Sequence, residues 1–408
     1  MRCSGYAARS ADAPEYHRWK GKRKENGNLH KICKKAAGTT KAGQKKICFF
    51  SGDITRSGGT ERAACLIANG LARRGEYEVC VLSLTEQAEG NKPFFWLDDR
   101  IAHTALGKRK VRPGLGCAAL LWRLRRFFKQ QNIDVVIDID IVLDALSVPA
   151  AFGTGTRVVS WEHFHFGYET GVRFGYRDLI VRHVTTKTDG IITLTERDRK
   201  AFLQGLRRPP QVFVIPNPMR EAKKCGQEVK KKWIVTTGRL VQEKGMDYLV
   251  HTARIVLTRY PDWRWVLLGD GRQRDWLQSQ VRAYHLEGKL LLQSQVADVD
   301  AYLEQAQIFV LTSRREGLPM SLLEAKAHGL ACVSFDIETG PGEIIADGVN
   351  GFLIPPYDCK HMASRIGQLI EDHGLRRTFM LNAGQGREKF QLDTVLDQWS
   401  WVLGHKIL

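Results

Sequence analysis

Two doubly wound α/β domains, each a parallel sheet packed between helices, are the fold that this sequence predicts. The chain has 408 residues, which exceeds the usual size of a single domain. Its residues are 43% apolar and 26% charged, which is enough to form a core in each domain. Short β-branched runs alternate with amphipathic stretches, and this alternation starts twice along the chain.

The first half of the chain contains six runs of strand type. They are predicted at Lys46–Ser51, Val79–Leu84, Asp134–Ile139, Arg157–Ser160, Gly190–Thr193 and Val212–Ile215. Residues 215–232 interrupt the pattern, because this stretch combines Pro216 and Pro218 with a lysine-rich segment. The alternation resumes with strands predicted at Trp233–Thr237, Trp265–Leu268, Lys289–Leu292, Ile308–Leu311 and Ala331–Phe335.

The break and the charge distribution predict four segments. Residues 1–44 are expected to be a basic, disordered extension, because residues 1–46 hold thirteen Lys or Arg but three acids. Residues 45–217 and 218–390 are the two expected domains, and residues 391–408 a helix that packs back on the first. Two such domains place the carboxyl ends of their strands along a shared cleft, so a ligand is expected there.

The composition excludes several classes of protein. No stretch of about 18 uncharged apolar residues is present, so the sequence predicts no membrane-spanning helix. The nine cysteines show neither a Cys-x-x-Cys pair nor a matched His spacing, which argues against zinc ribbons and disulfide frameworks. Cysteines within apolar strands suit a reducing compartment, and we expect a cytoplasmic protein.

In each half of the chain, a glycine-containing turn follows the first strand. Gly58 and Gly59 precede an apolar helix that Thr60 is expected to cap, and such a turn can hold a phosphate or serve a purely structural purpose. The turn from Gly238 to Gly245 adds Arg239 and Lys244, a forked donor and a point charge that suit a pyrophosphate. An exposed charged turn is the alternative for the second loop.

Two acids, Glu316 and Glu324, surround the start of a predicted helix after the strand Ile308–Leu311. Glu316 lies before the helix, at the carboxyl end of the strand. Glu324 lies more than one turn inside a helix rich in Leu and Ala, where an acid needs a partner. The vicinal hydroxyls of a ribose or another sugar could supply that partner.

This arrangement resembles the GT-B glycosyltransferases, and more narrowly their retaining family 4. The resemblance covers about residues 45–400 and rests on the Glu-x7-Glu pair, the Gly-Arg-Leu and Glu-Lys-Gly turn, and the Gly-Gly loop. The stretch Gly340–Ile345 and the motif Asp347–Leu353 add to it. It implies a hexosyltransferase that uses a nucleotide-sugar, expected to be a UDP-sugar, without a further cofactor. Bacterial members of this type build capsule, exopolysaccharide, lipopolysaccharide or lipid-linked glycans.

The resemblance also implies roles for particular residues. Residues 45–217 would form the acceptor side and residues 218–390 the donor side. Arg239 and Lys244 would neutralise the leaving diphosphate, and Glu324 would bind the donor ribose. The other implied donor-binding residues are Gly59, Asn217, Gly317 and Leu318. Glu316 would hold the transferred sugar as a catalytic residue, and His163 would face the reacting carbon, although an aromatic-flanked histidine is often a core residue.

The implied mechanism is retaining and needs no metal. The acceptor would attack the same face of the sugar from which the diphosphate leaves, since both glutamates are assigned to donor hydroxyls. The pair Asp138 and Asp140 matches the metal-binding Asp-x-Asp of another glycosyltransferase fold. It continues the apolar alternation of a strand, however, and two acids alone make a poor oxygen-ligand site.

Residues 107–131 contain eight cations and no acid, interleaved with apolar residues as in an amphipathic helix. Such a helix can lie on an anionic membrane, as an enzyme with a lipid-linked acceptor on the inner face of the plasma membrane requires. It can equally pack its apolar stripe on the sheet. Nucleic-acid binding through these cations, and a nucleotide-sugar epimerase or phosphorylase of the same architecture, remain alternatives, although we expect no specific nucleic-acid partner.

Overall fold

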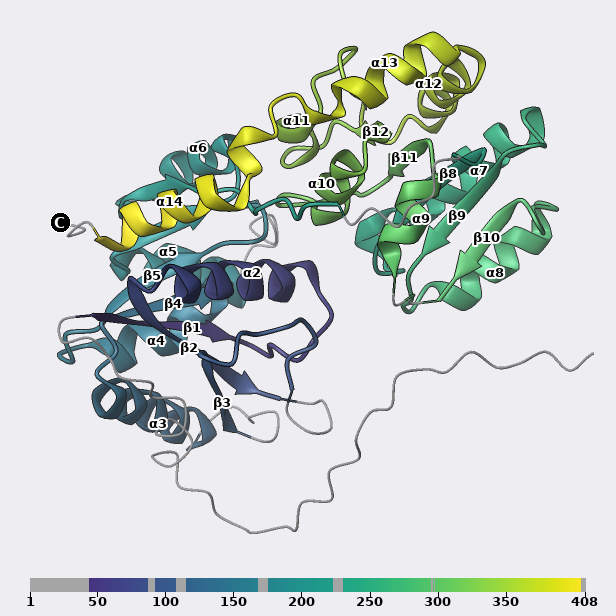
Figure 1. Ribbon diagram of the computed structural model, residues 1–408. Helices are drawn as coiled ribbons and strands as arrows, with labels where there is room; N and C mark the ends of the chain where they lie inside the picture. Colours follow the sequence, from purple (N-terminus) through teal and green to yellow (C-terminus); the bar gives the residue numbers. More distant parts are fainter. Residues whose placement is uncertain are drawn as a thin grey trace, which may run out of the picture.

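The computed structural model describes residues 44–86, 92–107, 115–167, 175–222, 230–294, 296 and 298–404, and these form two α/β domains (Figure 1). The expected basic extension lies outside the described residues, except for Gln44. Both domains are parallel sheets covered by helices on two faces, so the predicted doubly wound fold is confirmed.

The described part of the amino-terminal domain has a seven-stranded parallel sheet in the order β3-β2-β1-β4-β5-β6-β7. The strands are β1 (Lys45–Ser51), β2 (Tyr77–Thr85), β3 (Ala102–Gly107), β4 (Val135–Ile139), β5 (Arg157–Trp161), β6 (Gly190–Thr193) and β7 (Val212–Val214). The helices are α2 (Gly59–Arg74), α3 (Leu115–Gln131), α4 (Asp144–Ala151), α5 (Tyr176–His183) and α6 (Glu196–Gly205), with 3-10 turns η1 (Ile141–Leu143) and η2 (Thr185–Lys187).

The two faces of this sheet take alternate residues of each strand, as the period of a strand requires. On β1, Ile47 and Phe49 face the layer formed by α2, whereas Cys48 and Phe50 face α3 and α4. The central strands are therefore buried on both sides, which explains their nearly continuous apolar runs.

In its described residues, the carboxyl-terminal domain repeats this design with a six-stranded parallel sheet in the order β10-β9-β8-β11-β12-β13. Its strands are β8 (Trp233–Thr237), β9 (Arg264–Leu268), β10 (Leu290–Gln293), β11 (Ile308–Leu311), β12 (Ala331–Phe335) and β13 (Gly351–Ile354). Helices α7 (Met246–Arg259), α8 (Arg274–Ala283) and α12 (Cys359–Glu371) share one hydrophobic cluster with one face of the sheet. Helices α9 (Val299–Gln305), α10 (Met320–Ala327) and α11 (Pro341–Ile344) contribute to the cluster on the other face.

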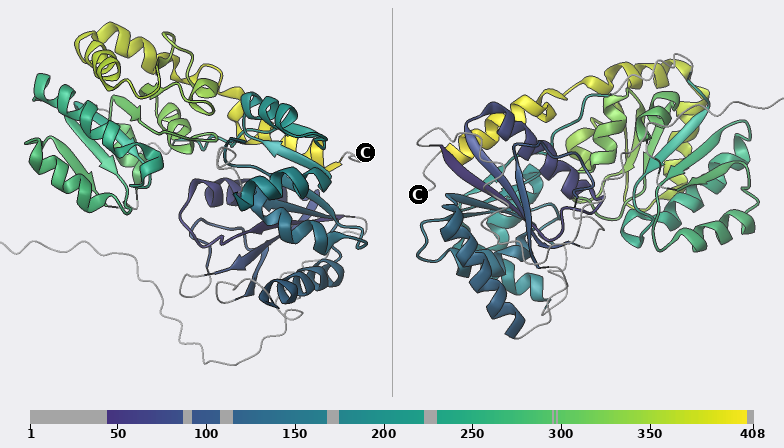
Figure 2. Two further views of the ribbon diagram at one scale, coloured as in Figure 1. Left: turned by 180° about the vertical axis from the view of Figure 1, so that it is seen from behind. Right: turned by 60° about the horizontal axis from the view of Figure 1, so that its bottom comes forward.

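The chain crosses between the two domains twice, and the two crossings lie next to each other. On the outward crossing, the backbone N–H of Met219 donates to the carbonyl of Phe390, which belongs to η5 (Glu388–Phe390), at 2.6 Å. The return crossing follows α13 (His373–Leu381) and η4 (Asn382–Gly384) and leads into α14 (Leu392–Gly404). Helix α14 lies beside α2 on the amino-terminal domain, as both Figure 1 and Figure 2 show.

Three local features differ from the sequence expectations. The edge strands β3 and β13 were not predicted, and β3 is only partly buried, so its residues carry a weak apolar signal. Thr60 does not cap the first helix, which begins at Gly59 without a capping side chain. The basic amphipathic segment is helical from Leu115, and its first four cations lie outside the described residues.

Candidate active site

The loop between β11 and α10 places Glu316 at the end of the carboxyl-terminal sheet that faces the other domain. One carboxylate oxygen, Oε1, accepts hydrogen bonds from Ser313 Oγ and from Lys244 Nζ, both at 2.6 Å. The backbone carbonyl of Glu316 accepts a bond from the Thr339 hydroxyl. Three separate loops therefore fix this acid, and the cation of Lys244 lies directly beside it.

The turn after β8 carries the two predicted phosphate-binding cations. Lys244 ends the 3-10 turn η3 (Gln242–Lys244), and α7 starts two residues later. Gly245 between them has φ +64°, and a Cβ there would lie 2.0 Å from the Thr312 carbonyl, so only glycine fits the turn. Arg239 is exposed, and it lies close enough to Glu61 in the other domain for its charge to oppose the rise in pKa that burial causes there. Both cations therefore lie at the domain interface, near the amino end of a helix.

Glu324 is buried in α10, and its partner in this structure is Arg62 of the amino-terminal domain. The two side chains form an ion pair between Arg62 Nη1 and Glu324 Oε1. Burial raises the pKa of the Glu324 carboxyl, while the charges of Arg62 and Arg220 oppose that rise. The partner that this buried acid requires is thus an arginine of α2, which the sequence analysis did not identify.

His163 follows β5 and is buried at the same interface. Its ring packs against Trp161 with the centroids 4.3 Å apart. Burial lowers the pKa of His163 to about 3, so the imidazole is neutral at pH 7. Its Nε2 atom is buried and finds no hydrogen-bond partner among the described residues. A neutral imidazole with an unused ring nitrogen can exchange a hydrogen bond with a ligand.

The backbone of the Glu316 loop touches the segment that carries His163. A Cβ added at Gly317 would lie 2.2 Å from the His163 carbonyl oxygen, so the two domains approach too closely here for any side chain. Leu318 is buried beside it, and its carbonyl accepts a hydrogen bond from Asn217 Nδ2 at 3.5 Å. A Cβ at Gly59 would lie 3.5 Å from Met320 Cγ. The structure therefore brings the predicted residues of both domains together at one interface.

Sequence reasoning missed several charged residues at this interface. Arg62 and Glu61 lie in the first turn of α2, directly after the glycine loop, and their position in the loop motif was the available signal. Glu61 is buried, and burial raises its pKa. Arg220 binds Asp300 through Nη2 at 2.5 Å, and Asp300 Oδ1 lies 3.0 Å from His328 Nε2. Arg220 lies just after the first crossing between the domains. Sequence alone does not show that this segment and Asp300 lie close to α10.

The Asp-x-Asp pair has partners inside the amino-terminal domain. Asp138 is fully buried, accepts a hydrogen bond from Ser147 and lies beside Asp144. Asp140 binds Arg177 Nη1 at 2.7 Å and caps η1. In the described segments, no group of three or more His, Cys, Asp or Glu is arranged to hold a metal ion.

The basic helix α3 packs its apolar stripe on the sheet. Four residues of this stripe are buried, namely Leu120, Leu124, Phe127 and Phe128. Its outer face carries Trp122, which is 59% exposed, with the guanidinium of Arg126 over the indole ring at 5.2 Å. None of the helices in the described segments combines the length and apolar composition needed to cross a bilayer.

Two parallel doubly wound α/β domains that meet at one interface are the architecture of the GT-B class of glycosyltransferases. Residues 58–218 match the family described as Glycosyl transferase 4-like domain, and residues 219–385 match Glycosyl transferases group 1. The chain therefore belongs to the glycosyltransferases that combine these two domains.

Similar proteins have the same organisation over most of the chain. An uncharacterized glycosyltransferase of Haemophilus influenzae is 29% identical over 88% of this chain and 100% of the relative. A Campylobacter jejuni relative, GalNAc-alpha-(1->4)-GalNAc-alpha-(1->3)-diNAcBac-PP-undecaprenol alpha-1,4-N-acetyl-D-galactosaminyltransferase, is 23% identical over 87% of this chain and 97% of its own length. The structure of the pneumococcal O-GlcNAc transferase GtfA, in complex with UDP and GlcNAc, superposes with a TM-score of 0.76 at 16% identity, covering 89% and 99% of the two chains.

Proposed function

We propose that this glycosyltransferase transfers a hexose from a UDP-sugar to a lipid-linked glycan, with retention of the anomeric configuration and without a metal ion. The observation that carries the proposal is the meeting of Arg239, Lys244, Glu316, Glu324 and His163 at one interface between the two sheets. The UDP bound to the pneumococcal structure and the undecaprenol-linked acceptor in the name of the Campylobacter relative support the substrate classes.

The proposed roles follow the order of groups in a nucleotide-sugar. Lys244 Nζ and Glu316 Oε1 lie 2.6 Å apart, so a site for the diphosphate adjoins a site for sugar hydroxyls, as the covalent order of the donor requires. Arg239 and the start of α7 add positive charge where the leaving diphosphate gathers negative charge. Glu324 binds the ribose hydroxyls, and the backbone of Gly317 and Leu318 supports the transferred sugar. Gly59 and Asn217 complete the donor site.

The proposed reaction is a substitution on one face of the sugar. The bond from the anomeric carbon to the diphosphate oxygen breaks, and a bond to the acceptor oxygen forms on the same face. The acceptor proton passes to the departing diphosphate. His163 is neutral at pH 7 because burial lowers its pKa to about 3, so its role is hydrogen bonding beside the reacting carbon and not charge stabilisation.

The test of donor class is thermal unfolding with UDP, GDP and ADP. A ligand that binds the folded protein raises its melting temperature by mass action. We expect UDP to stabilise the parent, and expect Arg239→Ala and Glu324→Gln to lose that effect. Arg282→Ala, an exposed arginine on the outer helix α8, is the matched control and should respond as the parent does. Absence of stabilisation by all three nucleotides would contradict the proposal.

The reaction class requires a second experiment. Incubation with a UDP-sugar and a lipid-linked acceptor should yield UDP and a lengthened glycan, and proton NMR of the new linkage should show the anomeric configuration of the donor. Activity should persist in EDTA. Conversion of the UDP-sugar without any acceptor would instead favour an epimerase, and phosphate-dependent release of a sugar phosphate would favour a phosphorylase. The family match does not favour a nucleic-acid-binding protein.

A further inference from the structure

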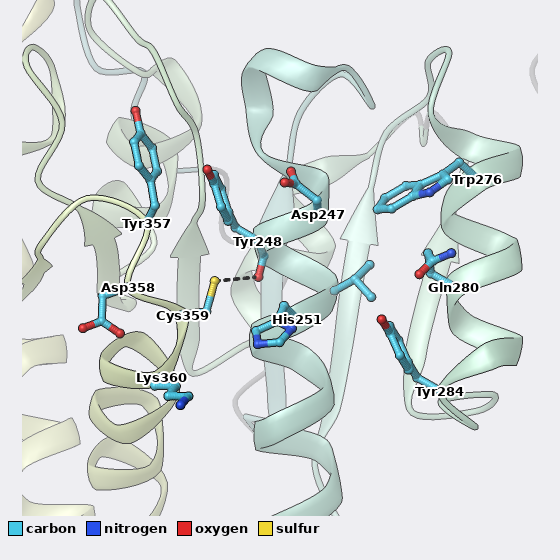
Figure 3. A pocket seen from close by; sticks show the side chains of 11 residues that line it. Asp247, Tyr248, His251, Trp276, Gln280, Tyr284, Tyr357, Asp358, Cys359 and Lys360 are labelled. Atoms are coloured by element: carbon cyan, nitrogen blue, oxygen red, sulfur yellow. Dashed lines mark hydrogen bonds between the residues drawn. The ribbon is translucent and has the colours of Figure 1, made fainter.

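A pocket of about 530 Å³ lies on the outer surface of the carboxyl-terminal domain, between α7, α8 and the start of α12 (Figure 3). Its volume falls in the range of sites for small ligands. Helix α7 runs through the middle of the view, with the residues of α8 on one side and those that begin α12 on the other. The thiol of Cys359 donates to the carbonyl of Tyr248 at 3.7 Å and joins the start of α12 to α7.

Four aromatic rings line the pocket: Tyr248, Trp276, Tyr284 and Tyr357. Trp276 is 39% exposed and Tyr357 is 44% exposed, so both leave ring surface open to solvent. Tyr248 and Tyr357 stack with their centroids 5.0 Å apart, which stiffens the rim. Fixed aromatic faces suit the apolar C–H face of a sugar ring, because they offer flat contact area at a small entropic cost.

Polar side chains alternate with these rings. His251, Gln280 and Lys360 project from three different helices and can exchange hydrogen bonds with hydroxyl groups. In the described part of the chain, no hydrogen bond or ion pair occupies the side chain of His251 or Lys360. A sugar ring has an apolar C–H face and polar hydroxyl groups. The aromatic rings of the pocket can contact the first, and its polar side chains can bind the second.

The charges around the pocket argue against an anionic ligand. Of the two acids in the lining, Asp247 is paired with an arginine and Asp358 caps the start of α12. The carboxylate of Asp247 accepts two hydrogen bonds from the guanidinium of Arg314, at 2.7 and 2.5 Å. Asp358 accepts the backbone N–H of His361 at 2.9 Å. The lining carries two carboxylates against one lysine, Lys360, so it favours a neutral ligand over a phosphate or nucleotide.

The pocket is linked to the loop that holds the proposed transferred sugar. Arg314 binds Asp247 on the pocket rim, and its Nη1 also donates to the carbonyl of Gln242 at 2.8 Å. Glu316 lies only two residues after Arg314. Arg314 therefore joins the rim of the pocket to the loop that carries Glu316.

We propose that this pocket binds a neutral sugar unit of the glycan that the enzyme extends, apart from the unit that reacts. This inference rests on the proposed function. Holding a second unit of the acceptor raises the effective concentration of its growing end and favours repeated use of long acceptors.

The test is saturation-transfer NMR of the full chain with the methyl glycosides of glucose, galactose, N-acetylglucosamine and N-acetylgalactosamine. At least one should receive saturation from the parent protein. The signal should fall at least fivefold in Trp276→Ala and persist in Arg239→Ala, which alters the proposed donor site. Trp122→Ala removes an exposed tryptophan of the other domain and is the matched control. Unchanged melting temperatures would show that each variant is folded.

Three results would overturn the proposal. They are the absence of saturation transfer to all four glycosides, a signal that survives Trp276→Ala, and a Trp276-dependent signal from UDP. The thermal test with UDP separates this outcome from failure of the proposed function. Stabilisation by UDP without glycoside binding would contradict the proposed role of the pocket and would still support the proposed function. Glycoside binding that depends on Trp276, without thermal stabilisation by any of the three nucleotides, would support the sugar site and contradict the proposed glycosyl transfer.

Discussion

At the scale of single residues, the domain interface combines buried charges whose partners come from the opposite domain. Glu324 and Arg62 are the clearest pair, since the acid belongs to α10 and the arginine to α2. Leaving one member of a buried pair alone is costly, so the remaining charge shifts its pKa or finds another partner. A donor ribose would compete with Arg62 for the same carboxylate oxygen.

Removing Arg62 should make nucleotide binding depend on pH. Burial already raises the pKa of Glu324, and Arg62 opposes this rise, so Arg62→Met raises the pKa further. The proposed ribose contact needs the carboxylate as acceptor, which exists only above that pKa. We expect calorimetry to show UDP binding by Arg62→Met weakening at least tenfold from pH 8 to pH 6, and the parent changing less. Equal pH dependence in the two proteins would disprove the competition.

Asp138 and Asp144 form a second buried group, remote from the proposed chemistry. Burial raises the pKa of both, that of Asp144 to about 6, and Ser160 and Thr185 donate to Asp144 at 2.7 and 2.6 Å. Because the folded pKa exceeds the unfolded value, the stabilisation is complete below pH 3.8 and is lost as pH rises through the folded pKa.

Asp138→Asn should therefore reduce the alkaline loss of stability. The amide can donate a hydrogen bond as a protonated Asp138 carboxyl would, but it cannot ionise. Between pH 6 and pH 9 we expect the melting temperature of the parent to fall by about 3 °C more than that of the variant, since about 1 kcal/mol corresponds to 2–4 °C in domains of this size. Parallel melting curves for the two proteins across this range would count against a proton held by the pair.

At the scale of elements, α14 fastens the end of the chain to the amino-terminal domain. Trp399 is fully buried and packs on Trp161 and Phe49, with centroids 4.9 and 6.0 Å apart. Leu396 packs against Gly70 of α2, and Arg74 pairs with Asp397 at 2.6 Å. The same tryptophan cluster supports the ring of His163, so α14 stabilises the site as well as the domain.

Two tryptophans of α14 allow a matched comparison. Trp399→Ala should lower the free energy of unfolding by about 3–5 kcal/mol, the usual effect of deleting a buried aromatic side chain. Trp401→Ala, which removes a side chain that is 54% exposed, should cost less than about 1 kcal/mol. Urea unfolding followed by circular dichroism measures both. Similar losses in the two variants would mean that α14 is held by something other than the tryptophan cluster.

The elements also show which strands and helix faces a sequence pattern can predict. The central strands are recognisable because they are buried on both faces and carry continuous apolar runs, as in Phe49 and Phe50. The edge strand β3 has one buried residue, Leu106, and its pattern resembles a loop. The membrane interpretation of α3 depended on which residues face outward, and packing on the sheet removes most of its apolar stripe from the surface.

At the scale of the whole molecule, α3 lies at the end of the amino-terminal domain remote from the carboxyl-terminal domain (Figures 1 and 2). An exposed tryptophan beside Arg126 and Lys129 is a suitable contact for the headgroups of anionic lipids. Contact through this end would place the amino-terminal domain, the proposed acceptor side, against the membrane that carries a lipid-linked acceptor. We propose this membrane contact in addition to the reaction, and it needs a test of its own.

Vesicle sedimentation tests this orientation. The double variant Arg126→Ala/Lys129→Ala should bind vesicles of phosphatidylglycerol and phosphatidylcholine about 30-fold more weakly than the parent, at about 1 kcal/mol for each cation. The matched control, Arg272→Ala/Arg282→Ala, removes two exposed arginines of the carboxyl-terminal domain and should bind as the parent does. Equal weakening in both variants would indicate a general charge effect without a preferred orientation.

The features that the sequence predicts depend on local patterns, and those that it does not predict depend on contacts between distant residues. Strand periodicity, glycine turns and the spacing of Glu316 and Glu324 are local patterns, and they specify the α/β class and the family resemblance because backbone geometry repeats over a few residues. Arg62 beside Glu324, Gly317 against the His163 carbonyl and the aromatic pocket of α7, α8 and α12 join residues far apart in the chain. Only tertiary packing decides such contacts, because they depend on how two separately formed sheets meet and on which helix faces their cores leave exposed.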